Sequence, residues 1–278
     1  MGTCTLCGQR AGWFKTDHEE CLSRREMAWT SMIELAERGL DTSVDVHQLE
    51  GELQSVATEN FMDSGKARKA LVSVWEGAVT QFLEDGLLTI EEETRLTNFK
   101  DRFSLDQSDL DAAGAFSRLV KAGALRDLTE GKFPERMTIT GTLPIRLQKS
   151  ERIIWVFPNT EYFEDRTKRE YVGQHSGVSL RVVKGVYYRI GGFRGHPIER
   201  TERTHIDTGV FVVTTKHLYF AGNKKSLRIP YQKIISLIPF SDGIGVHRDA
   251  ATAKPQIFVT GDGWFTYNLL ANVKHLTD

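Results

Sequence analysis

The 278-residue sequence predicts an α+β protein with more than one domain. Three observations support this expectation. All three cysteines lie within the first 21 residues, the next hundred residues have helical apolar periodicity without proline, and the pattern after Pro134 changes to the alternation of strands. We therefore expect a small cysteine-containing module over residues 1–25, an all-α domain over 26–135 and an antiparallel β barrel or sandwich with a C-terminal helix over 140–278.

The N-terminal module is defined by the sequences Cys4-Thr-Leu-Cys7 and His18-Glu-Glu-Cys21. Three thiolates and one imidazole on two short turns suit the tetrahedral coordination of Zn²⁺. A disulfide would leave one of the three cysteines unpaired, and ordinary buried cysteines would not be expected to cluster while the other 257 residues contain none. We therefore predict a closed, structural zinc knuckle with four ligands: Cys4, Cys7, His18 and Cys21.

The cysteine spacing also bears on the cellular compartment. The first residues lack the basic stretch and apolar run of a signal peptide, and no apolar segment approaches the ~20 residues needed to span a bilayer. Cysteine pairs of this spacing in a reducing compartment are more often metal ligands than disulfides. We therefore expect a cytoplasmic protein.

The charge is divided unevenly along the chain. Residues 1–139 hold 16 Lys and Arg against 25 Asp and Glu, whereas residues 140–278 hold 20 against 12. An acidic half and a basic half favour docking of the halves on each other, head-to-tail association, or a polyanionic partner for the basic half. Independent drift in the charge of two domains gives the same pattern, so the division does not choose among these.

The acidic half has the apolar spacing of amphipathic helices. In the first helix Trp29, Met32 and Ala36 are expected on one buried face. Gly86 is expected to end a helix, and Thr89 with Glu92 three residues later has the sequence of a capping box that starts the next. The expected apolar faces lie in four segments: 29–40, 46–56, 71–83 and about 106–125.

The turn Asp85–Glu92 has two further interpretations. An EF-hand loop ending at Glu92 would need carboxylates at positions 81 and 83, which are occupied by Gln81 and Leu83. The sequence therefore disfavours calcium binding. Its D-G-x-L-T-x-x-E-E pattern resembles the helical domains of tellurite-resistance B-like proteins. That resemblance implies an acidic metal site between two helix pairs, for which Ser104–Asp111 is the nearest second turn.

The basic half alternates in the manner of strands, with β-branched and aromatic residues between short turns. Pro158-Asn159-Thr160 is expected to end the first strand, and residues 264–273 return to helical spacing. The expected strands lie at 152–157, 178–183, 185–190, 210–214, 217–220, 226–229, 234–238 and 256–260.

Two stretches of this half resemble GRAM and bacterial pleckstrin-homology-like (PH-like) domains. The sequence from Gly209 to Gly222 (GVFVVTTKHLYFAG) is similar to the core strand pair of that family, and Lys225 to Leu237 continues the match. The resemblance implies a strongly bent, seven-stranded sheet pair with a C-terminal helix. It also implies a binding module for proteins or lipid headgroups.

We therefore expect a non-enzymatic adaptor that uses its PH-like domain for protein assembly. Tellurite-resistance B-like and PH-like modules occur together in bacterial stress and defence systems, so the two resemblances imply such a system. A peripheral membrane or phosphoinositide-binding protein and a nucleic-acid-binding accessory protein are the alternatives, since clustered Lys and Arg also hold phosphates. Candidate partner- or anion-binding residues are Arg10, Trp13, Phe14, Lys15, Lys184, Arg189, Arg194, Lys224 and Lys225.

The sequence contains no catalytic motif comparable in strength with the cysteine pattern. The glycine-rich stretch Gly191–Gly195 lacks the G-K-[ST] ending of a phosphate loop, and there is no G-x-S-x-G sequence. The histidines of the basic half, among them His217, are scattered and form no H-x-x-x-H pair. We therefore infer no small-molecule substrate.

Overall fold

The computed structural model divides the chain into two compact units, Met1–Arg136 and Met137–Asp278. It describes all residues except 1, 14, 176–177, 184–185, 191–192, 250–254 and 277–278. Within 166–201, and at residues 46, 274 and 275, it describes the backbone alone. None of the described helices is both long enough and apolar enough to cross a bilayer.

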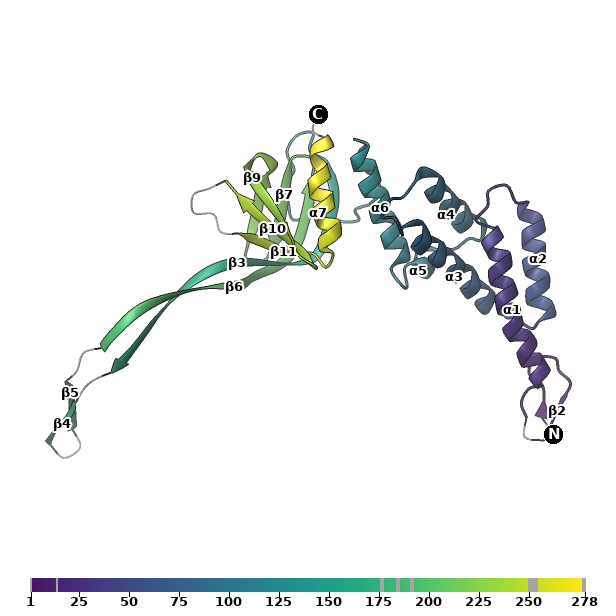
Figure 1. Ribbon diagram of the computed structural model, residues 1–278, viewed down its shortest axis with the longest axis horizontal. Helices are drawn as coiled ribbons and strands as arrows, with labels where there is room; N and C mark the ends of the chain where they lie inside the picture. Colours follow the sequence, from purple (N-terminus) through teal and green to yellow (C-terminus); the bar gives the residue numbers. More distant parts are fainter. Residues whose placement is uncertain are drawn as a thin grey trace. The chain divides into compact units, whose positions relative to one another are not determined.

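The first unit consists of a two-stranded ribbon followed by helices (Figure 1). Strand β1 pairs with β2 in antiparallel fashion, and helix α3 packs against α1, α4, α5 and α6. The elements are β1 (Gly2–Thr3), β2 (Arg10–Gly12), α1 (Glu19–Arg38), α2 (Val46–Glu59), α3 (Ser64–Phe82), α4 (Ile90–Arg102), α5 (Gln107–Leu110) and α6 (Ala115–Thr129).

The core of this unit is formed by the apolar faces that the periodicity predicts. Trp75 of α3 is fully buried, stacks on Phe116 and donates its indole N–H to the carbonyl of Leu96. The buried indole therefore has its polar group satisfied, as Trp requires in a core. The predicted burial of Trp29 in α1 is wrong, because 37% of this residue is exposed. Met32 and Ala36 of the same helix are buried as predicted.

The helix ends follow from local sequence. Thr89 and Glu92 form the expected capping box at the start of α4, with the side chain of each bound to the backbone N–H of the other. The single helix predicted over 106–125 is wrong. The chain leaves α5 after Leu110, and Gly114, at a φ of 74°, adopts the left-handed conformation before α6 begins.

An ionic cluster fixes the end of this unit. Arg126 and Arg136 both contact the carboxylates of Glu93 and Asp127, and all four side chains are at most 21% exposed. Burial by itself would raise the pKa of Glu93, but hydrogen bonds from Arg136 and Arg126 keep that pKa below its usual value. The cluster thus joins the segment after α6 to α4.

The second unit contains one seven-stranded antiparallel sheet and a C-terminal helix (Figure 1). The strand order is β8-β7-β6-β3-β11-β10-β9, so β8 and β9 are the two edges. The elements are β3 (Ile153–His175), β4 (Val178–Val183), β5 (Val186–Ile190), β6 (Phe193–Thr214), β7 (His217–Gly222), β8 (Ser226–Pro230), β9 (Ile234–Pro239), β10 (Gly243–Arg248), β11 (Gln256–Val259) and α7 (Gly263–Asn272).

The sheet corrects three sequence-based expectations. It is open, because among the described strands its edges β8 and β9 do not pair with each other, so the predicted barrel is not closed by hydrogen bonds. Pro158-Asn159-Thr160 does not end β3. Asn159 has a φ of 53° and the register of β3 on β6 shifts between Phe157 and Thr160, so the expected turn is an irregularity within one strand. Strand β10 was not predicted.

Beyond the sheet core, β3 and β6 continue as a two-stranded ribbon, registered as far as His175 with Phe193. The separate hairpin β4–β5 lies between them in sequence, at the positions where two strands are predicted. The core itself is aromatic. Phe211 stacks on Phe258 at 4.6 Å, and Phe265 of α7 meets Trp155 edge-on at 4.7 Å, which seats the helix on the sheet.

Candidate functional site

The loops of the N-terminal module bring the four predicted ligands together. The amide of Gly8 donates to the carbonyl of Cys4 at 3.0 Å, and Gly8 has a φ of 72°, which closes the turn that carries Cys4 and Cys7. His18 is the residue that precedes α1, and Cys21 lies in the first turn of that helix. One pair of ligands is therefore held by a tight turn and the other by a helix start.

The ligand atoms lie at distances suited to a metal ion. One atom from each of Cys4, Cys7, His18 and Cys21 is within 4.8 Å of every other. The Nδ1 atom of His18 is 3.3 Å from Sγ of Cys7 and 3.7 Å from Sγ of Cys21. Tetrahedral zinc with bonds of about 2.0–2.3 Å separates its ligands by roughly 3.5–3.8 Å, so the residues present fit such an ion.

The orientation of His18 is set by a second contact. Its Nε2 atom lies 2.9 Å from the backbone carbonyl of Arg10. A carbonyl only accepts, so Nε2 carries the proton and, in the neutral ring, Nδ1 presents its lone pair to the cysteines. Metal-bound histidines typically make such a contact with their other nitrogen.

The thiols differ in acidity. Burial acts to raise the pKa of Cys4, but backbone N–H groups of Cys7, His18 and Leu6 lower it to about 6. The pKa of Cys21 is raised to about 11 by burial and by its contacts with the sulfurs of Cys7 and Cys4. Neighbouring sulfurs thus resist simultaneous ionisation, and a bound cation removes that resistance because it neutralises their charge.

The module has a small apolar core of its own. Cys4, Ala11 and Cys21 are buried, with Leu6 and Phe61 packed against them. Phe61 follows α2, so the ligands also contact the helical part of the unit. A core of this size is too small to order the module by apolar burial alone, which agrees with a metal acting as a staple.

The predicted surface of this module is only partly described. Trp13 is 72% exposed, and Lys15 forms an ion pair with Glu19 at 2.9 Å. Arg10 lies in β2 with its side chain exposed and its carbonyl on His18. Phe14 lies outside the described residues.

The basic candidates of the second unit are not gathered into one described site. Lys184 lies outside the described residues, and Arg189 and Arg194 lie in β5 and β6, of which the structure describes only the backbone at those positions. The amides of Lys224 and Lys225 both donate to the carboxylate of Asp207, at 2.5 and 2.8 Å. These two lysines therefore lie beside an acidic side chain.

The acidic side chains of the turn Ser104–Asp111, the candidate for a second metal-binding turn, make structural contacts instead. Asp106 caps α5 through the amide of Asp109, and Asp109 binds Arg68. Asp111 accepts from both the amide and the hydroxyl of Ser117. Within the part of the chain that the structure describes, the cluster suited to a metal ion is the one formed by cysteine and histidine.

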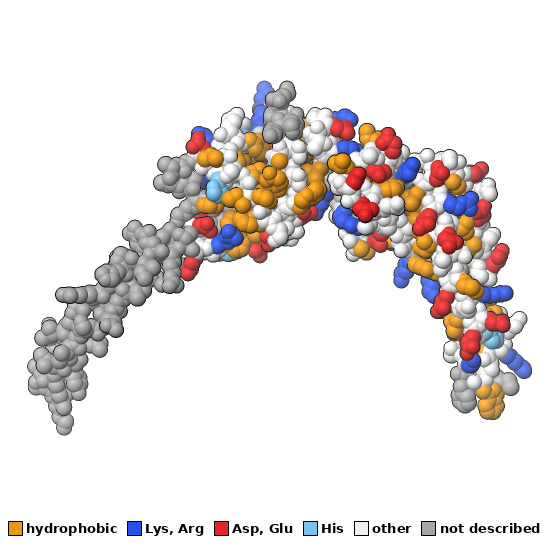
Figure 2. Space-filling view, in the orientation of Figure 1, with side chains coloured by type: hydrophobic (Ala, Val, Ile, Leu, Met, Phe, Trp, Pro, Cys, Tyr) orange, Lys and Arg blue, Asp and Glu red, His pale blue; other side chains and the backbone are white. Residues whose placement is uncertain are grey.

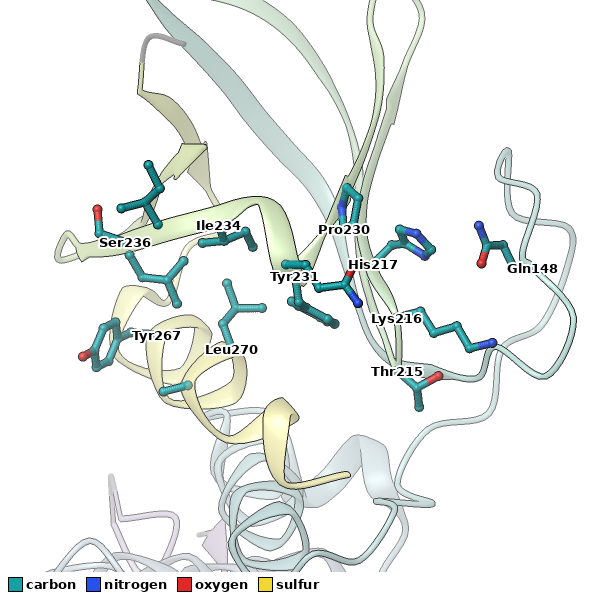
Figure 3. A pocket seen from close by; sticks show the side chains of 14 residues that line it. Gln148, Thr215, Lys216, His217, Pro230, Tyr231, Ile234, Ser236, Tyr267 and Leu270 are labelled. Carbon is teal, nitrogen blue, oxygen red and sulfur yellow. The ribbon is translucent and has the colours of Figure 1, made fainter. Parts of the chain in front are cut away.

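A groove of about 730 Å³ in the second unit was not anticipated from the sequence (Figure 3). One end is apolar, with side chains of β9 facing Tyr267 and Leu270 of α7. The other end is polar and is formed by Gln148, Thr215, Lys216 and His217. Hydrophobic side chains also gather over α7 and the neighbouring strands on the face shown in Figure 2. The groove thus suits a chain that is mostly apolar with a polar end.

The backbone beside the groove is open. The amide of Phe240 donates to the carbonyl of Gly243, which makes these two residues a hydrogen-bonded pair of the β9–β10 hairpin. Such pairs alternate along an antiparallel ladder, so the N–H and C=O of Leu237 point away from β10, toward the free edge. Ile235, 68% exposed, and Ile238, 39% exposed, lie on the same strand.

A buried carboxylate supports the polar end of the groove. The side chain of Glu151 is fully buried and accepts hydrogen bonds from Thr214 at 2.5 Å, His217 at 2.9 Å and Tyr219 at 2.9 Å. The amide of Gln148 adds a fourth at 2.7 Å. Burial by itself would raise the pKa of Glu151, but these hydrogen bonds outweigh it and lower that pKa. The carboxylate therefore fixes the ring of His217 at the groove.

Glu151 and the groove could not be predicted from the sequence because their parts come from distant segments. Glu151 and its three side-chain partners are 63 to 68 residues apart, and no motif links them. Comparison of the chain with family models, with curated proteins and with solved structures gave no match.

Proposed function

We propose that this protein is a non-enzymatic adaptor: a structural zinc ion orders its N-terminal module, and its β unit binds an extended polypeptide segment beside β9. The observation that carries the proposal is the apolar groove along an unpaired sheet edge. An edge strand offers backbone donors and acceptors to another chain, and side-chain pockets alongside it select the sequence. Both elements are present here, with Leu237 contributing to each.

The zinc part rests on the donor set. Three thiolates and one imidazole complete a tetrahedral shell, so no position remains for a substrate or a reactive water. When bound, the ion would cross-link β1–β2 to the start of α1. The chain's own contribution is the fixed His18 ring and the tight turn at Gly8.

The PH-like interpretation of the second unit is part of the same proposal. Seven strands in one antiparallel sheet, followed by a helix whose Phe265 packs on Trp155, support it. A scaffold of this kind holds the edge strand rigid, so a partner strand meets a preformed surface. Preformed surfaces lose less conformational entropy on binding.

The groove is tested by selection from a random peptide library against the full chain. Ile235→Lys is the counter-selection target, because an exposed edge lysine opposes strand addition without disturbing the core. We expect enriched peptides to carry apolar residues at alternate positions and to lose binding to Ile235→Lys. Peptides that bind both proteins equally, or no enrichment at all, would contradict the proposal.

A further inference from the structure

The segment 137–145 has the sequence pattern of a strand. Its sequence, Met-Thr-Ile-Thr-Gly-Thr-Leu-Pro-Ile, places an apolar residue at every odd position except Gly141 and threonine or proline between them. Strict alternation of this kind is typical of a strand with one apolar face. The segment lies outside the helices and strands that the sequence predicts.

The structure leaves this segment without a strand partner. Residues 137–145 are described throughout and belong to no helix or strand. Met137 and Ile139 are 38% and 39% exposed, although both belong to the apolar face. Leu143 and Ile145 are half-buried, so the exposed part of the apolar face lies at the start of the segment. One chain therefore holds a partly exposed apolar strand sequence and, in the same unit, an open strand edge beside an apolar groove.

We propose that segment 137–145 of a second copy of this chain occupies the groove as an added strand on β9, and that the exchange is reciprocal in a two-fold dimer. The inference rests on the proposed function of the groove and names its occupant. Each copy supplies one segment and one edge, so reciprocal exchange in a two-fold dimer pairs both segments and covers both β9 edges. The apolar residues of the segment then cover the groove wall formed by β9 and α7.

Within a single copy, neither segment 137–145 nor the outer edge of β9 has a strand partner among the described strands. The carbonyl of Arg146, next to the segment, accepts from Tyr219 of β7, and the amide of Gln148 donates to Glu151. These contacts hold the end of the segment at the polar end of the groove. The segment preceding them has no strand partner within its own chain, and β9 pairs with β10 on one side alone among the described strands.

The position of Pro144 fits an outer strand. Consecutive residues of a strand direct their backbone groups to opposite sides, so odd residues that bind β9 leave the even residues facing solvent. Pro144 is even-numbered, and its missing N–H then costs no ladder hydrogen bond. The same proline blunts the new edge, which opposes growth beyond a dimer.

The experiment is sedimentation velocity on the full chain over micromolar concentrations. Ile235→Lys changes the edge, Ile139→Asp changes the segment, and Leu87→Lys is the matched control, since Leu87 is 70% exposed in the other unit. We expect a wild-type mass of twice 31.5 kDa. Either groove variant should weaken the dimer at least about tenfold, and the control should not.

Two additions separate this contact from other interfaces. A mixture of Ile235→Lys and Ile139→Asp has one intact segment and one intact edge, so it should associate more strongly than either variant alone. A synthetic peptide of residues 137–145 in excess should dissociate the wild-type dimer. Both results are specific to strand exchange.

Other outcomes overturn the inference. A wild-type monomer throughout the range, or a dimer that both variants leave unchanged, excludes the exchanged strand. A monomer whose unfolding temperature falls in Ile139→Asp places the segment on its own chain instead. If library peptides bind the groove while the wild type is monomeric, the proposed function stands and only the choice of occupant fails.

Discussion

Replacing Glu151 by Gln tests whether the buried carboxylate organises the polar end of the groove. All four groups on this carboxylate donate to it: the hydroxyls of Thr214 and Tyr219, the ring of His217 and the amide of Gln148. Gln has one accepting oxygen and one donating NH₂ group. The substitution keeps the volume and changes only charge and hydrogen bonding.

The size of the effect follows from these contacts. The amide of Gln148 only donates, so the Gln NH₂ must turn toward Thr214 and His217, where two charge-assisted hydrogen bonds are lost. Hydrogen bonds to charged groups contribute about 1.5–3 kcal/mol each, and rearrangement of His217 recovers part of this. We expect a loss of about 3 kcal/mol, equivalent to a fall of roughly 10 °C in Tm for a unit of this size.

The stability that Glu151 contributes should decrease as the pH falls. The pKa of Glu151 is lowered in the folded protein, so its contribution is present above the unfolded pKa of about 4.3 and is lost as pH falls through the folded value. The difference between wild type and Glu151→Gln should therefore be full at neutral pH and shrink in acid.

Thermal unfolding of the full chain, followed by circular dichroism at several pH values, measures both effects. Glu161→Gln is the matched control, because Glu161 lies in the same unit with its side chain exposed. Surface substitutions of this kind change stability by at most about 0.5 kcal/mol. Equal unfolding temperatures for Glu151→Gln and Glu161→Gln at pH 7 would refute the reasoning.

Three further predictions concern the metal, a helix start and a close backbone approach. The wild type should contain one zinc per chain by mass spectrometry and Cys4→Ser none; full retention of the metal by Cys4→Ser would remove that residue from the ligand set. Thr89→Ala should destabilise the helical unit by about 1 kcal/mol in urea titrations, whereas an unchanged midpoint would show that the capping box adds no stability. Gly243→Ala should destabilise the β unit by about 2 kcal/mol, because the added Cβ would lie 2.8 Å from Cα of Val259 and against the carbonyl of Phe258; wild-type stability would show that β10 shifts freely.

Local sequence determined the features that depend on neighbouring residues. The spacing of Cys4, Cys7, His18 and Cys21 predicted a cluster, and the structure brings the four ligand atoms together. The capping box at Thr89 is confirmed for the same reason, since all of its groups lie within four residues. Period-two alternation predicted the positions of most strands of the basic half, because successive side chains of a strand lie on opposite faces and one face is apolar.

Two interruptions of the local pattern were predicted wrongly. Pro158–Thr160 has the composition of a turn, yet pairing of β3 with β6 on both sides continues the strand through it. The break at Gly114 depends on one left-handed residue that the helical periodicity on either side conceals. At Pro158–Thr160 a local preference gives way to longer-range pairing, whereas at Gly114 one glycine overrides the periodicity of its neighbours.

Only the tertiary structure decided where the groove and the open strand edge lie. Glu151 meets His217 across 66 residues, and the groove combines the segment before β3 with β9 and α7. Whether a strand is central or at an edge depends on which strands pair, and the unpaired edge of β9 appears only once the sheet order is fixed. The sequence by itself determined the cluster of cysteines and histidine and most of the apolar faces, because these depend on spacing along the chain. The groove and its open edge depend on contacts between segments that spacing does not describe.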